Sequence, residues 1–278
     1  MISSTRLDGI ALVVGGGRGI GQQAGFSLAE AGAEVIVFAD LNEESAVSTA
    51  EESKQYASNK NYRTASIKAD VTKADEVQNM VDFVVREFGR IDYCVNSAGI
   101  DNGVHTPVAD TDIDNFNRVI DVNTKGLMLC IRAQTAAMRR QQPKMFKSRS
   151  GERDIGRGAI VNLASANSFA GLPGKMCYTV SKHADMALTK MAAMDHASEG
   201  IRCNAVCPTW VQTPLLDIEL QKNPQVQAEI AAVVPIKRAA KCEEVSDAIA
   251  FLCSPAASYI NGTSLVIDSA VTTTIRLH

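Results

Sequence analysis

The sequence has no apolar run long enough to cross a membrane. A transmembrane helix needs about 18 or more consecutive apolar residues, and no stretch of the 278 residues reaches that length. Residues 1–9 are polar and lack the apolar core of a secretory signal. These two absences predict a cytoplasmic protein without a membrane partner.

The chain also lacks an excess of charge of either sign. It has 28 basic and 31 acidic residues, for a net charge of −3. Proteins that bind nucleic acids or anionic membranes carry a clear positive surface. We therefore expect no nucleic-acid partner.

Cysteine pairs with metal-binding spacing are missing as well. Seven cysteines are present, and no two of them form a CxxC motif. Cys203 and Cys207 are four residues apart, but no further Cys or His lies close by to complete a zinc site. This scatter favours buried thiols in a reducing compartment, and no metal site is predicted.

What the sequence does contain is a regular alternation of strand-like and helix-like segments. Such alternation predicts an α/β protein whose parallel sheet is covered by helices on both faces. No linker or shift in composition divides the chain, so residues 1–278 are expected to form a single domain. The predicted strands are residues 10–14, 35–39, 64–69, 91–95, 159–163, 202–206 and 264–267, and the predicted helices are residues 22–31, 43–56, 77–88, 112–138, 178–197 and 245–252.

One polar insertion, residues 139–158, interrupts this alternation. It carries seven basic residues, which are Arg139, Arg140, Lys144, Lys147, Arg149, Arg153 and Arg157. It could dock an anionic partner, but a run of charge is more often a solvated loop. We therefore predict a loop.

A glycine-rich turn, residues 15–21, follows the first predicted strand. Without side chains, its backbone N–H groups can approach a pyrophosphate at the start of a helix. Asp40 ends the second strand, where a carboxylate accepts hydrogen bonds from the adenosine ribose and repels a 2′-phosphate. The next residue is Leu41, and no Arg or Lys follows closely that could bind the 2′-phosphate of NADP. This favours NAD over NADP, although Arg18 could reach the same pocket. Asp40 could also cap the helix that begins near residue 43.

Tyr178 and Lys182 are four residues apart in a predicted helix, so they project from one face. A free tyrosine, with a pKa near ~10, is a poor base, but a neighbouring ammonium group lowers that pKa. Ser165 follows a predicted strand, and its hydroxyl could hold a substrate oxygen beside Tyr178. Together they predict proton transfer by Tyr178 during hydride transfer.

These motifs resemble those of the short-chain dehydrogenases/reductases over residues 7–270. The family's TGxxxGxG loop appears as residues 14–21, its NNAG segment as residues 96–99 and its YxxxK motif as residues 178–182. Further matches are Asp70-Val71, Asn123, the serine motif at residues 160–165 and the proline turn at residues 208–213. The resemblance implies a single-domain Rossmann-type fold, a doubly wound parallel sheet of about seven strands flanked by helices on both faces.

The resemblance also implies a role for each matched residue. Tyr178 is the general acid/base, Lys182 contacts the nicotinamide ribose, Ser165 orients the substrate oxygen, and Asn123 holds a water that links Lys182 to solvent. The residues implied to bind NAD are Gly15, Arg18, Gly19, Ile20, Asp40, Leu41, Asp70, Val71, Asn96, Ala98, Gly99, Tyr178, Lys182, Pro208, Val211 and Thr213. Those implied to contact the substrate are Ser165, Asn167, Tyr178, Thr209 and Trp210.

The chain departs from the family pattern at a few positions. Val14 replaces a threonine, Ser97 an asparagine and Thr209 a glycine, and Ser269-Ala270 replace a glycine pair. None of these changes affects the four catalytic residues. We therefore expect an active enzyme with an unusual substrate pocket.

Three segments are expected to line that pocket, namely residues 100–107, 166–174 and 209–223. Their apolar members are Phe169, Leu172, Met176, Trp210, Leu215, Leu216 and Leu220, counting Met176 just beyond the second segment. They suit a hydrophobic alcohol or ketone from secondary metabolism, of terpenoid, steroid, polyketide or alkaloid type. Some could instead belong to the core or to a subunit interface. Residues 208–226 are expected to act as a substrate lid.

Three functions fit these observations. The first is an NAD-dependent secondary-alcohol dehydrogenase, and the second is an NADPH-dependent ketone reductase that uses the same residues in reverse. The third is a non-redox member of the fold, a cyclase, an isomerase or an NAD sensor, and the intact Ser165, Tyr178 and Lys182 argue against it. The resemblance further implies a homotetramer or homodimer with residues 112–138 and 178–197 at one interface.

Overall fold

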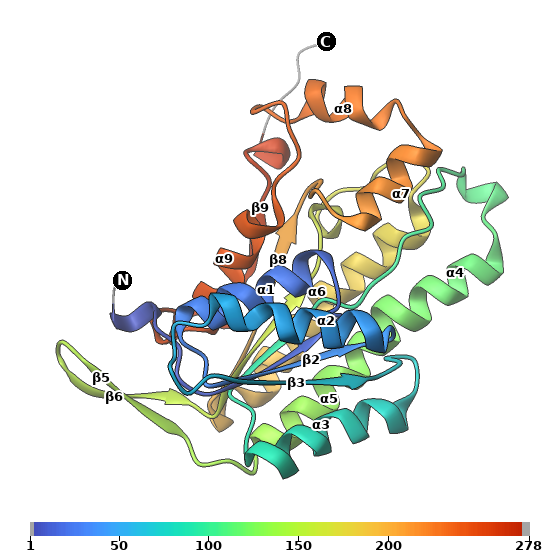
Figure 1. The fold of residues 1–278 in the computed structure, drawn as a ribbon. Coiled ribbons are helices and arrows are strands. Elements are labelled where there is room, and N and C mark those ends of the chain that lie inside the picture. The colour runs from blue at the N-terminus through green and yellow to red at the C-terminus, as the bar shows by residue number, and fades with distance from the viewer. Residues whose placement is uncertain (1–2, 274–278) are drawn as a thin grey trace.

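A computed structural model describes residues 3–273 of the chain (Figure 1). Its centre is a seven-stranded parallel sheet with the strand order β3-β2-β1-β4-β7-β8-β9. The order reverses direction at β1, as expected for a doubly wound sheet. The strands are β1 (Ile10–Val14), β2 (Val35–Asp40), β3 (Arg63–Lys68), β4 (Tyr93–Asn96), β7 (Gly158–Leu163), β8 (Ile201–Pro208) and β9 (Ser264–Ile267).

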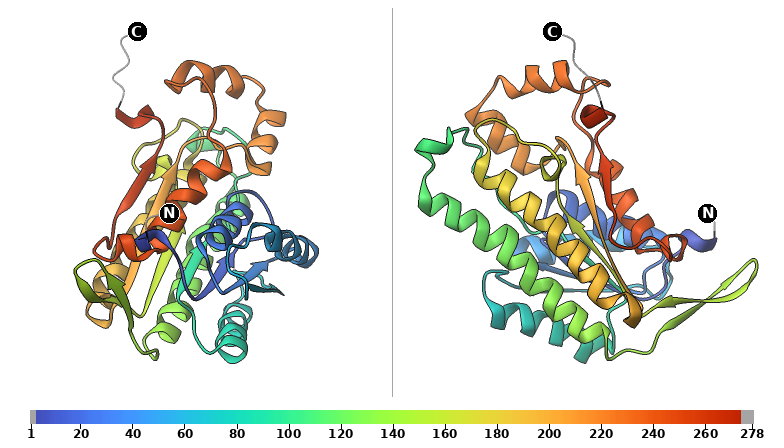
Figure 2. Two further views of the ribbon diagram at one scale, coloured as in Figure 1. Left: turned by 60° about the vertical axis from the view of Figure 1, so that its left-hand side comes forward. Right: turned by 180° about the vertical axis from the view of Figure 1, so that it is seen from behind.

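Helices cover both faces of this sheet (Figures 1 and 2). Two apolar clusters fill the two sides, one beneath α1, α2 and α9 and the other beneath α3, α5 and α6. The helices are α1 (Gly19–Ala31), α2 (Glu43–Ser53), α3 (Ala74–Phe88), α4 (Ile113–Val119), α5 (Leu127–Met138), α6 (Met176–His196), α7 (Pro214–Lys222), α8 (Val226–Val233) and α9 (Cys242–Cys253). Short 3-10 turns are η1 (Ser3–Thr5), η2 (Lys54–Tyr56), η3 (Val108–Asp110), η5 (Ala166–Ser168), η6 (Ala197–Glu199), η7 (Pro255–Ala257) and η8 (Val271–Thr273). The predicted fold is confirmed.

The long helix predicted for residues 112–138 contains a change of winding. Between α4 and α5 lies η4, a π-helical segment over Ile120–Gly126. Asp112 accepts hydrogen bonds from the first backbone N–H groups of α4 and so marks the start of the whole unit. Wide π turns are rare and occur mostly at functional sites. Asn123 lies inside this one.

The insertion at residues 139–158 is not the irregular loop that its charge predicted. Its middle forms an antiparallel hairpin, β5 (Lys144–Ser148) and β6 (Gly151–Gly156). The guanidinium of Arg153 lies 5.5 Å from the centroid of the Phe146 ring and covers it. The hairpin projects from the molecule (Figures 1 and 2). The charge of this segment did not predict the hairpin. Long basic side chains can pack through their apolar stems while their charged ends stay in water, so a charged segment can still form strands.

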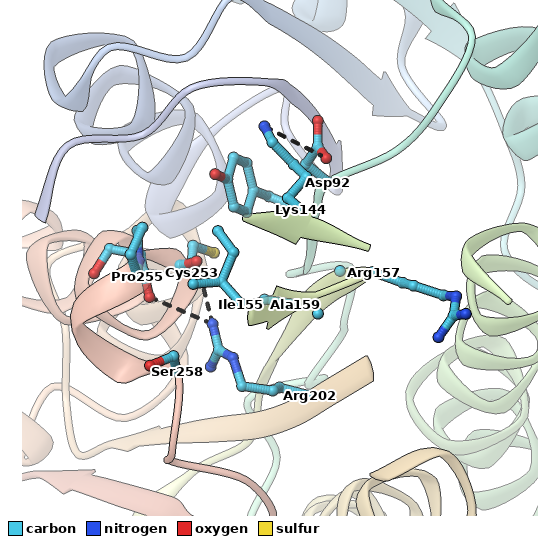
Figure 3. Close-up of a pocket in the computed structure, with 13 residues that line it drawn as sticks. Asp92, Lys144, Ile155, Arg157, Ala159, Arg202, Cys253, Pro255 and Ser258 are labelled. Carbon is cyan, nitrogen blue, oxygen red and sulfur yellow. Dashed lines mark hydrogen bonds and ion pairs between the residues drawn. The ribbon is translucent and has the colours of Figure 1, made fainter. Parts of the chain in front are cut away.

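At the base of this hairpin lies a small cavity of about 20 Å³ (Figure 3). Lys144 points toward Asp92, and Arg202 donates to the carbonyl oxygens of Cys253 and Ser254, whereas Arg157 points away. The space is large enough for about one water molecule. The Lys144 contact ties the hairpin to the segment before β4, and the Arg202 contacts tie β8 to the end of α9.

At the opposite end of the sheet, α7 and α8 form a lobe beyond the carboxyl ends of the strands (Figure 1). The lobe has its own apolar cluster of Leu216, Val226, Ile230, Val234 and Ala239. The segment predicted as a lid, residues 208–226, contains all of α7. Within the described residues, no helix is long and apolar enough to span a membrane.

One departure from the family pattern has a visible backbone consequence. Ser269 and Ala270 have φ angles of 50° and 69°. This left-handed region favours glycine, because a Cβ crowds the following carbonyl at a cost of roughly 1 kcal/mol per residue. A glycine pair, which the family pattern has at these two positions, would adopt such angles without that cost.

Candidate active site

A cleft of about 460 Å³ opens where the carboxyl ends of β4, β7 and β8 meet the α7–α8 lobe. Parallel strands bring their carboxyl ends to one edge, so segments far apart in the sequence converge there. Three of the four predicted catalytic residues line the cleft, Ser165, Tyr178 and Lys182. The predicted substrate contacts Asn167, Thr209 and Trp210 line it too.

The glycine turn between β1 and α1 is shaped for close approach. Gly15 has a φ of 75°, and a Cβ there would lie 2.5 Å from the backbone nitrogen of Ala98. A Cβ on Gly21 would collide with the carbonyl oxygen of Gly15. Beside Gly19 the nearest atom would be the Thr213 methyl carbon, at 3.6 Å. An anion therefore has room at the N-terminus of α1, where the helix dipole favours it, so the turn fits a pyrophosphate.

Asp40 lies at the end of β2, directly beside this turn. Its carboxylate accepts hydrogen bonds from the Gly17 nitrogen at 2.9 Å and from the Asn42 nitrogen at 3.0 Å. The residue that caps α2 is Asn42, whose side chain accepts from the Ser45 nitrogen. Asp40 is therefore not the helix cap, and its negative charge lies at the rim of the glycine turn.

Ser165, Tyr178 and Lys182 come together because β7 ends beside the first turns of α6. The Ser165 hydroxyl accepts a hydrogen bond from the Asn167 nitrogen and starts the turn η5. One helical turn separates Tyr178 from Lys182, and the ammonium nitrogen lies 5.6 Å from the tyrosine ring centroid. The YxxxK spacing thus gives the shared face that the sequence predicted.

The electrostatics at Tyr178 differ in part from the prediction. Burial raises the pKa of the Tyr178 hydroxyl, and the charges of Asp101 and Asp185 raise it further, whereas Lys182 and a hydrogen bond from Ser165 lower it. The net pKa lies above the ordinary tyrosine value. Lys182 acts in the predicted direction, but burial and two carboxylates outweigh it.

Lys182 is held on two sides. Its ammonium group donates to the Leu163 carbonyl oxygen at 2.8 Å and to the Asp185 carboxylate at 2.9 Å. Burial lowers the pKa of Lys182, but the attraction of Asp185 outweighs it and leaves that pKa above its ordinary value. Lys182 therefore stays charged.

Asn123 is buried in η4 and does not line the cleft. Its side-chain amide exchanges two hydrogen bonds with the backbone of Ile100, at 2.8 and 2.9 Å, and donates to the Ser181 hydroxyl at 3.0 Å. These bonds fix the segment after β4 against α6 beside Lys182. The implied water relay at Asn123 stays a prediction.

The remaining predicted cofactor residues divide into three groups. Ile20, Gly99, Pro208, Val211 and Thr213 line the cleft. Ala98 packs against the glycine turn, and Arg18 and Leu41 are exposed near it. Asp70 and Val71 follow β3 at the same carboxyl-end edge of the sheet, three strands along from β4, and their implied contact with the cofactor stays a prediction.

The side chain of Asn96 points into the core, and the implied cofactor contact of this residue stays a prediction. It is buried, and its amide bonds to Gln134 and to Asn162 at 2.7 to 3.0 Å within the core. A buried amide needs such partners, and here they lie beneath β4 rather than in the cleft. Any contact of Asn96 with a cofactor would have to come from its backbone.

The substrate part of the cleft is less apolar than predicted. Leu172, Trp210, Leu215 and Leu216 line it, but Phe169, Met176 and Leu220 do not. Four charged residues that the sequence analysis missed line it as well: Asp101, Lys175 and Glu219, and the exposed Glu229 of α8. Their only early signal was membership of, or closeness to, the predicted substrate segments.

Asp101, Lys175 and Glu219 form a cluster with His105, which we call the Lys175 cluster; Lys175 is buried and the other three residues are partly buried. The Lys175 ammonium lies 2.7 Å from Asp101 and 2.9 Å from Glu219, and the His105 ring lies 3.1 Å from Glu219. Burial lowers the pKa of Lys175, but its two carboxylate partners raise it to a net value above normal. Because Glu219 belongs to α7, the cluster joins the lobe to the body of the protein.

No group of three or more potential metal ligands occurs within residues 3–273. The seven cysteines are free thiols, and burial raises the pKa of Cys130, Cys203 and Cys253 to about 12. Thiols that ionise so late are poor metal ligands at neutral pH.

Comparison with known proteins agrees with this geometry. A family model described as enoyl-(acyl carrier protein) reductase matches residues 14–272. The short-chain dehydrogenase fogB of Aspergillus ruber is 43% identical over 268 residues, which cover 96% of this chain and 98% of that protein. The chain belongs to the short-chain dehydrogenase/reductase family.

Solved structures of the family are similar to this chain over nearly its whole length. A gluconate 5-dehydrogenase from Burkholderia cenocepacia J2315 in complex with NADP and tartrate has 28% identity and a TM-score of 0.85, covering 98% of this chain and 99% of its own. A 7α-hydroxysteroid dehydrogenase complexed with NADH and 7-oxo glycochenodeoxycholic acid has 25% identity and a TM-score of 0.82, covering 96% of each chain. This short-chain dehydrogenase/reductase is thus an oxidoreductase of alcohols and ketones with a nicotinamide cofactor.

Proposed function

We propose that this protein transfers a hydride between NAD(H) and a secondary alcohol or ketone on a hydrophobic small molecule. The observation that carries the proposal is the placement of Ser165, Tyr178 and Lys182 in one cleft with the glycine turn at its rim. The substrate and the cofactor would meet there.

The proton chemistry follows from the positions of these side chains. The nicotinamide ring, when bound, accepts or supplies the hydride. In the oxidation direction, Tyr178 takes the proton of the substrate hydroxyl through its phenolate oxygen, and Ser165 donates a hydrogen bond to the substrate oxygen. Lys182 stabilises the phenolate and would bind the nicotinamide ribose. In reduction the same tyrosine returns the proton.

The choice of NAD rests on Asp40. Its carboxylate lies over the glycine turn, where it would accept hydrogen bonds from ribose hydroxyls and repel the 2′-phosphate of NADP. An NADPH-dependent reductase is the second candidate, because the similar gluconate 5-dehydrogenase was solved with NADP. Arg18, exposed at the start of α1, is a nearby cation that would favour it.

The substrate class follows from the walls of the cleft. Leu172, Trp210 and Leu215 offer apolar surface, and the Lys175 cluster offers hydrogen-bonding groups. An amphiphilic molecule with a fused-ring or long apolar body fits this mixture, such as a steroid, terpenoid, polyketide or alkaloid intermediate. A steroid ketone is bound by one structural relative.

The test compares cofactors and then alcohols. We expect calorimetry to give tighter binding of NAD than of NADP, and a panel of hydrophobic secondary alcohols to yield NADH. Tyr178→Phe should reduce turnover by at least about 100-fold while NAD binding stays within about twofold, because phenylalanine keeps the ring and loses only the hydroxyl that transfers the proton. Tighter binding of NADP, or unchanged turnover in the variant, would contradict the proposal.

A further inference from the structure

A second carboxylate sits next to the proposed proton-transfer group, and the mechanism above does not use it. Asp185 follows Lys182 by three residues on α6, and its side chain is 1% exposed. One oxygen accepts a hydrogen bond from the Lys182 ammonium at 2.9 Å. The other is buried without a hydrogen-bond partner in the described part of the chain.

This arrangement is poorly explained by stability alone. Burying a carboxylate is costly, and the cost is offset only when both of its oxygens are well paired. An apolar residue would pack at this helical position without that penalty. Buried charges with incomplete partners occur often at functional sites, where their field acts on a reacting group.

Asp185 affects the geometry of Lys182. The ammonium group has three hydrogens, of which one reaches Asp185 and one reaches the Leu163 carbonyl oxygen. These two acceptors fix the nitrogen below the cleft and leave the third hydrogen for the ribose or a water molecule. Without Asp185, only the Leu163 carbonyl would hold it.

Asp185 also affects the charge balance around Tyr178. The ionisable groups that face this region are Lys182 and Asp185 on α6, Asp101 after β4 and the Cys207 thiol on β8. Asp101 is paired with Lys175, whereas Lys182 is the only cation paired with Asp185 within residues 3–273. Asp185 thus offsets much of the positive charge that would stabilise the phenolate.

We propose that Asp185 is a positioning residue that holds Lys182 in place and, by offsetting its charge, sets the pH at which Tyr178 gives up its proton. The inference rests on the proposed function for its catalytic meaning. Its physical content, an electrostatic coupling between residues 178, 182 and 185, can be measured in the protein without cofactor or substrate.

The first experiment is a spectroscopic titration of tyrosine ionisation in the absence of ligand. The signal of Tyr178 is the difference between each protein and the same protein carrying Tyr178→Phe. Asp185→Asn keeps the shape of the side chain and removes its charge, so the Tyr178 midpoint should fall by about one pH unit. An unchanged or higher midpoint would overturn the proposal.

Two control variants separate this effect from general ones. Asp185→Glu keeps the charge and should titrate closer to the parent than Asp185→Asn does. Asp195→Asn removes an exposed carboxylate from the same helix, and solvent should screen its effect to nearly nothing. A shift of equal size in Asp195→Asn would also overturn the proposal.

A second pair of variants covers the case in which Asp185→Asn does not fold. Lys182→Met removes the cation, and adding Asp185→Asn removes the carboxylate that this leaves unpaired. The double variant holds no buried lone charge, so it should be more resistant to unfolding than Lys182→Met, and its Tyr178 midpoint should be lower. Equal midpoints in the two proteins would refute the coupling.

Turnover supplies the catalytic readout. With any alcohol that the enzyme oxidises, the acidic limb of the pH profile of kcat/KM should move in Asp185→Asn by the same amount and in the same direction as the titration. A uniform loss of kcat/KM at every pH would indicate a merely structural role and count against the proposal. If no alcohol is oxidised, the proposed function fails, while the titration still decides the coupling.

Discussion

At the scale of single residues, we propose that Asp40 decides between NAD and NADP. Its carboxylate is held by the backbone nitrogens of Gly17 and Asn42, so it cannot easily swing away from an incoming ribose. A fixed negative charge discriminates against a phosphate more strongly than a mobile one, because no reorganisation relieves the repulsion.

We therefore expect Asp40→Ser to weaken NAD binding by roughly tenfold, about 1.4 kcal/mol, and to strengthen NADP binding. The hydroxyl keeps one hydrogen-bonding group and removes the charge. Glu44→Gln is the matched control, since it removes an exposed charge from the first turn of α2. Calorimetric titration of both cofactors measures the ratio. If the ratio of NAD affinity to NADP affinity stays as in the parent protein, Asp40 does not decide the choice of cofactor.

Residue-level prediction succeeded where spacing along one element decides contact. Tyr178 and Lys182 share a helix face whatever surrounds them, and both line the cleft. It failed where a contact depends on another element or on burial. Lys175 was missed because its partners Asp101 and Glu219 come from other parts of the chain. Asp185 was missed because spacing alone does not show that this carboxylate is buried against Lys182.

At the scale of elements, α7 decides how the cleft is covered. Three sets of side-chain contacts join it to the segment after β4. Glu219 meets Lys175 and His105, Lys222 donates to the Asn102 carbonyl oxygen at 2.7 Å, and Asn223 donates to that of Gly103 at 2.6 Å. We propose that α7 is the moving part of the predicted lid at residues 208–226 and that these contacts hold it closed.

Glu219→Gln should loosen this closure by roughly 1–2 kcal/mol, because Lys175 loses one of its two carboxylate partners. Trypsin cleavage after Lys222 should accelerate, and NAD with substrate should slow it. Asp217→Asn, an exposed position on α7, is the control. If trypsin cleaves Glu219→Gln at the same rate as the parent protein, the Lys175 cluster does not hold the lid closed. If NAD and substrate do not change the cleavage rate, this segment does not act as a lid.

The hairpin β5–β6 and the π segment η4 were beyond the reach of pattern analysis. The hairpin forms because Arg153 covers Phe146 and donates to the Pro255 carbonyl oxygen at 2.7 Å, a contact between residues 102 positions apart. The π segment is only seven residues long. Over that length its spacing of apolar residues cannot be told apart from that of an α-helix. Only the bonds that Asn123 makes to Ile100 and Ser181 show why the winding matters there.

At the scale of the whole molecule, exposed apolar side chains gather on the helices that the family resemblance places at an interface. Val180, Met191 and Met194 are 43%, 52% and 72% exposed, and their spacing puts them on one face of α6. Ile113 on α4 and Met128 on α5 are exposed as well. We propose that this face joins subunits in a homodimer or homotetramer.

Sedimentation at micromolar concentration should therefore give a mass at least twice that of the 29.7 kDa chain. Met191→Glu should shift the distribution toward the single chain, because a charge buried in an apolar interface lacks a partner. Met145→Glu, on the projecting hairpin, is the matched control and should leave the mass unchanged. A parent protein that sediments as a single chain would contradict the proposed assembly.

The sequence by itself determined the fold class, the order of the strands along the chain and the residues of the glycine turn and the YxxxK motif. These depend on hydrophobic period and on spacing within one element, both of which are local properties. The tertiary structure alone decided the charged lining of the cleft, the turning of Asn96 into the core and the pairing of Asp185 with Lys182. Each depends on side chains from different elements, or on a rotamer and its burial, and no local pattern encodes them.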